Sequence, residues 1–366
     1  MMKHIGCCRF VWNYLLNEQR QKKEEKYVSK NLMSKTLTKL KEKNEYSWLS
    51  EVSAFSLKRI CRDLEFAYVS FFKKNNGFPK FKTKKMSKQS FPVRTERLYF
   101  SKEKEVYLEK IGKVKCCTDF IFPIGRNKQK FYGGQVYLKR NKWLLRLSIE
   151  HENQMRKLTE HSMGIDLGIK ELAVVEFNGQ CKVFHNINKS KKMKKLNKKL
   201  KYYQRKQHRQ YRNNPKNKSK KDCKWEKSKN IVKTEDKIKR IYAKIADIRH
   251  NYIHQTTHKL VETLPCRIIM EDLKVSNMMK NKHLSRAIGE MCWYEFIRQM
   301  KYKSEWNGIE FIQVDRFYPS SKTCSCCGNI KRNLKLSDRT YICDICGLTI
   351  DRDYNAAINL SKYVVQ

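Results

Sequence analysis

Residues 164–175 of this chain read Gly-Ile-Asp-Leu-Gly-Ile-Lys-Glu-Leu-Ala-Val-Val, within an apolar stretch that spans residues 163–175. Such a run is typical of a buried central strand, yet it contains the carboxylate Asp166. Burying a lone charge costs free energy unless the charge is paired or bound to a metal. A second apolar stretch, 180–184, follows Asn178-Gly179, a dipeptide that favours tight hairpins. The sequence therefore predicts a hairpin that carries an acid in a central strand.

The chain beyond this hairpin alternates between helices and strands. Apolar spacing predicts a helix over residues 234–264, a short buried strand over 266–270, a helix over 291–306, a strand over 309–314 and a closing helix over 355–364. This order predicts an α/β unit whose mixed sheet combines an antiparallel hairpin with parallel strands.

Two further acids occupy positions that such a sheet could bring to Asp166. Glu271 follows an apolar strand, and Asp353 lies at the start of the last helix. Strand ends and a nearby helix start can converge at one edge of an α/β sheet. Three convergent carboxylates suit two Mg²⁺ (or Mn²⁺) ions roughly 3.5–4 Å apart, which promote phosphodiester hydrolysis. We predict this site, with Asp166 as the shared ligand. Spacing alone does not exclude that each acid caps a strand end or forms an ion pair. It also does not exclude the neighbouring acids Asp272, Asp315 and Asp351 as the residues of the site.

The cysteines near the C-terminus form two Cys-x-x-Cys pairs separated by 15 residues. Each pair is followed by a glycine, Gly328 or Gly347, which allows the backbone to turn beneath a metal. Four thiolates on two such turns form a closed tetrahedral zinc site with a structural role. The extra thiol Cys326 has the wrong spacing to be a ligand. The predicted zinc ligands are Cys324, Cys327, Cys343 and Cys346.

The charge balance points to a polyanionic partner. The 366 residues include 81 Lys and Arg against 36 Asp and Glu, a formal net charge of +45. Nucleic acid is the natural partner, because neutralising phosphates releases counterions; a ribosome-like or membrane-surface protein is the alternative. Residues 189–229 hold 19 Lys or Arg against two acids. Four aromatic residues interleave them, which favours a phosphate-gripping arm over a solvated helix face. These are Tyr202, Tyr203, Tyr211 and Trp225.

No segment holds the roughly 18 consecutive apolar residues needed to span a membrane. The first residues lack the apolar core of a signal peptide. The 14 cysteines are therefore interpreted as thiols in a reducing compartment, which predicts a cytoplasmic protein. Outside the two pairs, isolated cysteines such as Cys61, Cys181 and Cys266 are predicted to be core residues.

The first half of the chain has two patterns. Apolar spacing predicts helices between residues 8 and 81, with the clearest series over 55–71. Alternation with period two then predicts strands at 110–115, 135–140 and 143–148, the last two joined by a tight turn. These strands predict a small β-barrel or sheet.

Taken together, these motifs resemble the TnpB family of transposon-encoded, RNA-guided DNA nucleases related to the type V CRISPR effectors. The resemblance covers nearly the whole chain. Its most specific pieces are GIDLGIKELAVV (164–175), IIMEDLKVSNM (268–278), DRFYPSSKTCSCCG (315–328), CDICG (343–347) and DRDYNAAINL (351–360). Weaker pieces are CRFVWNYLLNE (8–18), GFPKFKTKK (77–85) and KIGKVK (110–115).

The resemblance implies a multidomain α/β and β protein. It places a β-barrel wedge domain at 1–8 and 88–158, a helical recognition lobe at 9–87, a RuvC-like nuclease domain of the RNase H-like fold at 159–314 and 347–366, and a zinc ribbon at 315–346. It makes Asp166, Glu271 and Asp353 the catalytic acids, and it selects Asp353 over Asp351 because the family's acid stands two places before Asn355. Relatives carry a further strand ahead of the first helix, so the barrel is expected to be truncated at its N-terminus.

The resemblance also implies partners. Such proteins bind a guide RNA made from the transposon end, read a short adjacent motif through the protein, and read double-stranded target DNA by base pairing. A monomer associated with the nucleoid of a bacterium or archaeon is expected. Two other functions stay open at this point: RNA-guided DNA binding without cleavage, as in a repressor, and unguided nuclease activity or an accessory role to a transposase.

Overall fold

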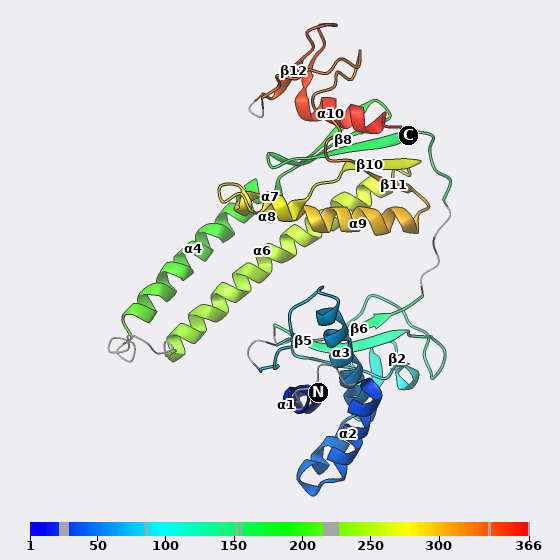
Figure 1. Cartoon of the computed structure of the whole chain (residues 1–366), viewed down its shortest axis with the longest axis vertical. Coiled ribbons are helices and arrows are strands. Elements are labelled where there is room, and N and C mark those ends of the chain that lie inside the picture. Colours follow the sequence, from blue (N-terminus) through cyan, green and yellow to red (C-terminus); the bar gives the residue numbers. More distant parts are fainter. Residues whose placement is uncertain are drawn as a thin grey trace. The chain divides into compact units, whose positions relative to one another are not determined.

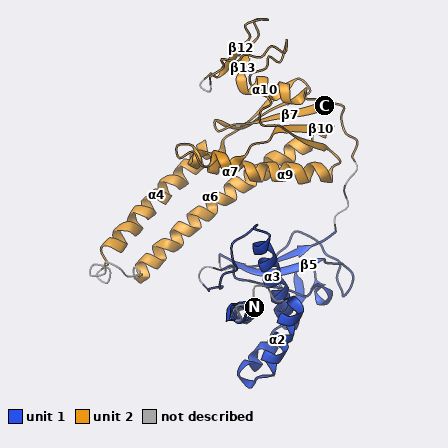
Figure 2. Ribbon diagram, viewed as in Figure 1, with its two compact units in different colours: residues 1–151 blue, residues 152–366 orange. Residues whose placement is uncertain are grey.

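The computed structural model describes residues 1–21, 29–84, 87–140, 142–150, 153, 156–214, 227–335 and 338–364 (Figure 1). The chain divides into two compact units, Met1–His151 and Glu152–Gln366 (Figure 2). Each unit encloses hydrophobic clusters of its own. Across the described ranges, no helix has both the length and the apolar character that a membrane crossing requires.

Helices open the first unit. α1 (Met2–Gln21), α2 (Lys30–Glu42), the 3-10 helix η1 (Asn44–Glu51) and α3 (Ala54–Phe72) pack on one core. The helical pattern was predicted to start at Cys8, but α1 already begins at Met2. The earlier start has a packing reason, because Ile5 is buried and the ring of His4 lies 4.8 Å from that of Phe91.

The strands of this unit form two antiparallel sheets of three strands each. One contains β1 (Ser90–Pro92), β5 (Gly133–Lys139) and β6 (Lys142–Ser148); the other contains β2 (Tyr99–Lys102), β3 (Glu105–Leu108) and β4 (Gly112–Lys115). A short 3-10 helix, η2 (Thr95–Arg97), lies between β1 and β2. The predicted hairpin over 135–148 is confirmed as β5–β6. Among the described residues the strands pair as separate sheets, and no closed barrel is present.

A five-stranded mixed sheet is the centre of the second unit. Its strands are β7 (Ser162–Leu167), β8 (Glu171–Phe177), β9 (Gln180–His185), β10 (Arg267–Glu271) and β11 (Glu310–Val314), in the order β11-β10-β7-β8-β9. β7 pairs in parallel with β10 and β10 with β11, whereas β8 is antiparallel to both β7 and β9. The predicted mixed sheet is therefore confirmed.

One boundary inside this sheet was predicted wrongly. Residues 163–175 were interpreted as a single strand, but they fold as β7 and β8 with a turn over residues 168–170. Both strands are largely buried and the turn between them is short, so residues 163–175 read as one mostly apolar run. Gly168 and Lys170 of the turn stand out no more than Asp166 and Glu171 of the strands do. The predicted hairpin at Asn178-Gly179 joins β8 to β9, and both residues have positive φ, 52° and 74°, as a tight primed turn requires.

Helices cover both faces of the sheet (Figure 1). α10 (Arg352–Ser361) lies on one face, where Leu360 packs with Ile269. α6 (Lys229–Val261) and α9 (Trp293–Trp306) cover the other face, where Phe296 packs with Met163 and Ile165. Because strand side chains alternate, Gly164 and Asp166 must face α10. The short helices α7 (Val275–Met278) and α8 (Ser285–Met291) precede α9.

A long helical hairpin extends from this sheet. The 3-10 helix η3 (Ile187–Lys189) leads into α4 (Lys191–Arg212), which packs along α6 through a stripe that includes Met193, Leu200 and Ile241 (Figure 1). Serine side chains cap the start of α4 and of α6. Residues 215–226 of the predicted basic arm, with Trp225, lie outside the described residues. The described part confirms the predicted helix.

Gly164 sets the distance between β7 and α10. A Cβ atom at this position would lie 2.0 Å from the carbonyl oxygen of Ala357 and 2.5 Å from the backbone nitrogen of Ser361. Backbone atoms cannot move aside as a flexible side chain can. Only glycine therefore lets α10 rest directly on the strand that carries Asp166.

Gly164→Ala is expected to destabilise the second unit by at least about 3 kcal/mol, because α10 must move off β7. The loss can be measured by chemical unfolding monitored by circular dichroism. Gly6→Ala in α1 is the matched control, since a Cβ there meets nothing within 4 Å. Equal stability of Gly164→Ala and wild type would contradict the close approach.

The isolated cysteines do not all lie in the core. Cys61 is buried as predicted, but Cys181 is exposed on β9 and Cys266 is only partly buried. β9 is an edge strand of the sheet, so its side chains are less covered than those of the central strands.

Candidate active site and metal centre

Asp166 and Glu271 lie on adjacent strands and on the same face of the sheet. Ile165 of β7 is opposite Met270 of β10, so the next residue on each strand, Asp166 or Glu271, continues that parallel register. Met163, Ile165 and Met270 belong to the core beneath α6 and α9. Alternation then turns both acids toward α10.

Asp353 approaches the same face from the first turn of α10. It lies four residues before Ala357, which rests on Gly164, and four residues make about one turn of an α-helix. One turn of helix is about as long as two residues of a strand, and the effect of Asp353 on the pKa of Asp166 shows that the turn leads toward Asp166. The three predicted acids come from β7, β10 and α10.

Asp351, the alternative to Asp353, has a structural role. Its carboxylate oxygen Oδ1 accepts hydrogen bonds from the backbone N–H groups of Asp353 at 3.0 Å and Tyr354 at 3.1 Å. It is the N-cap of α10. Asp315 is likewise used locally, because its Oδ1 accepts from the backbone N–H of Phe317 at 2.8 Å.

The pKa of Asp166 reflects how close the other acids are. Burial, followed by the carboxylates of Glu271 and Asp353, raises the pKa of Asp166 well above its ordinary value. Arg352 partly opposes this shift, and Asp351 adds a smaller contribution in the same upward direction. Like charges gathered in this way repel one another unless a cation neutralises them. This donor set of carboxylate oxygens fits Mg²⁺ or Mn²⁺. The ligand oxygens of these three described acids do not all lie within 4.8 Å of one another.

Sequence reasoning missed the groups that surround Glu271. The Ser320 hydroxyl donates a hydrogen bond to Oε1 of Glu271. Ser320 is buried, and its carbonyl oxygen accepts from Nδ2 of Asn359 on α10 at 2.7 Å. The only sign of these two residues in the sequence is that Ser320 lies in the motif at 315–328 and Asn359 in the motif at 351–360.

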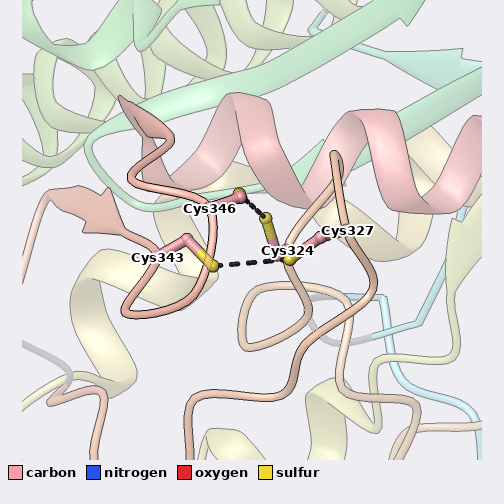
Figure 3. A group of neighbouring side chains, drawn as sticks. All are labelled: Cys324, Cys327, Cys343 and Cys346. Carbon is pink, nitrogen blue, oxygen red and sulfur yellow. Dashed lines mark hydrogen bonds between the residues drawn. The ribbon is translucent and has the colours of Figure 1, made fainter.

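The four predicted zinc ligands do converge (Figure 3). Their sulfur atoms all lie within 4.8 Å of one another, and the Cys324–Cys346 and Cys327–Cys343 pairs are 3.6 and 3.5 Å apart. Four sulfurs about 2.3 Å from a tetrahedral zinc ion would be about 3.8 Å apart, so the cage fits zinc. Cys326 is exposed and stands outside the cluster, as predicted.

The two cysteine turns have matching backbones. Gly328 and Gly347 have φ values of 76° and 72°, and their N–H groups donate to the carbonyl oxygens of Cys324 and Cys343. Backbone N–H groups of Cys346 and Ile345 lower the pKa of Cys343 to about 6, whereas burial and the neighbouring thiols raise the pKa of Cys346 to about 12. The short strands β12 (Thr340–Ile342) and β13 (Thr349–Asp351) flank the second turn. The cluster therefore suggests a structural zinc.

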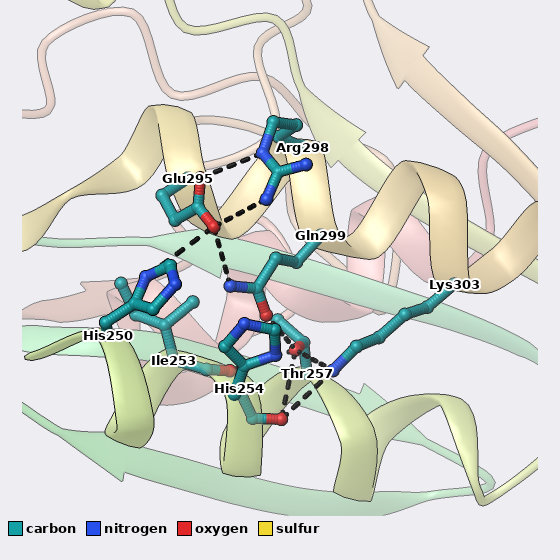
Figure 4. A network of polar contacts seen from close by, with 8 residues as sticks. All are labelled: His250, Ile253, His254, Thr257, Glu295, Arg298, Gln299 and Lys303. Carbon is teal, nitrogen blue, oxygen red and sulfur yellow. Dashed lines mark hydrogen bonds and ion pairs between the residues drawn. The ribbon is translucent and has the colours of Figure 1, made fainter. Parts of the chain in front are cut away.

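A second group of possible ligands joins α6 to α9 (Figure 4). It contains His250, His254 and Glu295. Here the carboxylate is already satisfied: Arg298 donates to both of its oxygens at 2.8 Å, and Gln299 donates to Oε1 at 2.8 Å. Because these donors occupy Glu295 and Lys303 lies nearby, we interpret the group as a network that ties the two helices together.

Glu295→Gln is expected to lower the free energy of unfolding by about 1–3 kcal/mol at pH 7. The Arg298 hydrogen bonds are the main reason that the pKa of Glu295 falls from 4.5 to about 2. The contribution is therefore complete above about pH 5 and is lost as the pH falls toward 2. Denaturant unfolding at several pH values, with Glu305→Gln on the same helix as control, checks this. If the difference in unfolding free energy between wild type and Glu295→Gln did not shrink as the pH falls, this role of Glu295 would be contradicted.

Three domain families match the chain. Residues 1–26 match a "Helix-turn-helix domain", residues 146–282 match "Probable transposase" (OrfB_IS605), and residues 293–360 match "Cas12f1-like, TNB domain". The last range contains the four cysteines and all of α10 except its final residue. The chain also superposes on the protein of a Cas12f1–sgRNA–target DNA complex with a TM-score of 0.59 at 16% identity, over 99% of this chain and 82% of that one. It therefore has a Cas12f-like fold.

Two curated relatives align over 98% of the chain. Their names begin "Putative RNA-guided DNA endonuclease"; one is from Streptomyces pristinaespiralis, 28% identical over 84% of its length, and the other is InsQ of Escherichia coli, 30% identical over 87% of its length. The chain belongs to the TnpB (OrfB_IS605) family, which is related to Cas12f.

Proposed function

We propose that this chain is an RNA-guided DNA endonuclease that cuts target DNA at one RuvC-like site. The observation that carries the proposal is the approach of Asp166, Glu271 and Asp353 on one face of a mixed sheet, in a chain of net charge +45. The family and the names of its relatives support the guided, DNA-directed part of the activity.

The roles of the three acids follow from their places. Asp166 is close to both of the other acids, so we assign it as the shared ligand, and Glu271 and Asp353 each complete one metal position. Two Mg²⁺ ions, when bound, would supply an activated water and stabilise the leaving oxygen of the phosphodiester. The α10 N-terminus adds its positive dipole end beside Asp353 and favours that carboxylate.

The α4–α6 hairpin has the charge to hold nucleic acid. Eleven of the 22 residues of α4 are Lys or Arg, and none is acidic. A groove on α4 is lined by Lys198, Lys201, Arg205 and Arg209 with Tyr202, whose ring is half exposed. Phosphates suit the cations and a base can stack on the ring. We assign this helix to guide RNA or heteroduplex binding.

The remaining parts follow the family's division. We propose a wedge domain at 1–8 and 88–158, a recognition lobe at 9–87, a RuvC-like domain of the RNase H-like fold at 159–314 and 347–366, and a zinc ribbon at 315–346. The partners are a guide RNA from the transposon end and double-stranded DNA, with the protein gripping duplex shape and base pairing supplying sequence.

RNA that co-purifies with the protein tests the guided activity. The protein should be expressed with its native flanking DNA, purified, and its bound RNA sequenced. We expect one RNA species that begins in the element's end and runs into adjacent DNA. RNA of mixed origin, together with DNA cleavage that ignores the RNA present, would favour an unguided nuclease.

A further inference from the structure

The segment between β11 and the first cysteine turn lies against one side of α10. Side chains of Asn355, Asn359 and Lys362 bind its backbone between residues 320 and 325. They stand four and three residues apart, so they form one stripe along α10 and its C-cap, Lys362. The other stripe of α10, through Ala357, rests on β7. α10 therefore contacts the acid-bearing strand with one side and the cysteine ribbon with another.

The contacts on the first stripe are close and buried. Asn355 Nδ2 donates to the carbonyl of Thr323 at 2.7 Å, and its Oδ1 accepts from the backbone N–H of Ser325 at 3.0 Å. Asn359 Nδ2 donates to the carbonyls of Ser320 and Thr323, both at 2.7 Å. Both asparagines are buried. Buried amides of this kind fix the backbone that they bind.

Ser320 connects these contacts to one of the three acids. Its side chain is buried, so the hydroxyl needs a partner within the protein, and that partner is Oε1 of Glu271. A hydrogen bond to one carboxylate oxygen selects the rotamer of the acid and directs its second oxygen. Groups that orient metal ligands in this way typically change metal affinity or activity by about 10–100-fold.

We propose that Ser320 is a positioning residue for Glu271, and that Asn359 holds Ser320 in place from the same helix that carries Asp353. The proposal rests on the proposed function, because it assigns Glu271 to divalent metal binding. It makes one helix set the positions of two of the three acids. It also links the cysteine cluster, whose first ligand Cys324 follows four residues after Ser320, directly to the proposed metal site.

Mn²⁺ binding measured by electron paramagnetic resonance tests the proposal without relying on activity. Mn²⁺ prefers carboxylate oxygen to thiolate, so the cysteine cluster does not compete for it. Ser320→Ala should weaken Mn²⁺ binding by about 10-fold or more and raise the Mn²⁺ concentration needed for half-maximal cleavage. Ser320→Thr, which keeps the hydroxyl, should recover part of the affinity.

Ser321→Ala is the matched control, since it removes a neighbouring hydroxyl in the same segment. It should bind Mn²⁺ as the wild type does. Zinc content and the thermal midpoint of each variant exclude misfolding. Wild-type Mn²⁺ affinity in a folded, zinc-loaded Ser320→Ala would overturn the proposal, as would equal losses in both alanine variants. If the wild type binds Mn²⁺ but never cleaves DNA, the proposed function fails while the positioning role stands.

Discussion

Replacing Asp166 with alanine is expected to lower the rate of target cleavage by at least about 10³-fold while leaving nucleic-acid binding nearly unchanged. The reason is geometric, because Asp166 has Glu271 on the adjacent strand β10 and Asp353 on α10 as its neighbours. Binding should survive because the substitution leaves unchanged the basic helix α4, to which we assign nucleic-acid binding. Single-turnover cleavage and filter binding on the same complex measure the two effects separately.

Two variants of neighbouring aspartates sharpen this test. Asp353→Asn should lose cleavage as Asp166→Ala does. Asp351→Ser should keep it, because serine is also a good N-cap acceptor and Asp351 caps α10 through the N–H groups of Asp353 and Tyr354. Loss of cleavage in Asp351→Ser with retention in Asp353→Asn would show that the wrong aspartate had been assigned.

The second large effect is expected from the cysteine cluster. Cys343→Ser should abolish stoichiometric zinc binding and reduce cleavage at least about 10-fold, because metal binding and folding of such a site are one process. The loss should reach the acids, since Asn355 joins α10 to the backbone of Thr323 and Ser325 at the first turn. Metal analysis of the purified protein and cleavage rates give both quantities.

Cys326→Ser provides the matched control for the cluster. This cysteine lies inside the first turn but is exposed and is not among the four converging sulfurs. It should retain zinc and activity. Purified wild type without zinc, or a Cys343→Ser variant that cuts at the normal rate, would remove the structural role assigned to the cluster.

Patterns local in sequence predicted much of the second unit. Glycine-bounded pairs of cysteines specify their own geometry, and the cluster formed as predicted. The mixed sheet followed from the hairpin signal and from buried strands separated by helices, because parallel strands need crossover connections. The split of residues 163–175 was missed, since two largely buried strands joined by a very short turn give one mostly apolar pattern.

Contacts between distant residues could not be predicted in the same way. Ser320 meets Glu271 across 49 positions, and Asn359 meets Ser320 across 39. Neither residue is unusual in its own segment. Spacing also could not separate Asp353 from Asp351; the family resemblance selected Asp353, and the structure adds a physical reason by giving Asp351 a capping role.

Reprogramming the guide tests the central claim most directly. The protein would be produced with a guide RNA whose targeting end has been replaced, and offered two DNA duplexes, one matching the new guide and one matching the old. We expect cleavage of the new target alone, in the presence of Mg²⁺, and none by Asp166→Ala. Cleavage of both duplexes, or of the old target alone, would contradict an RNA-guided endonuclease.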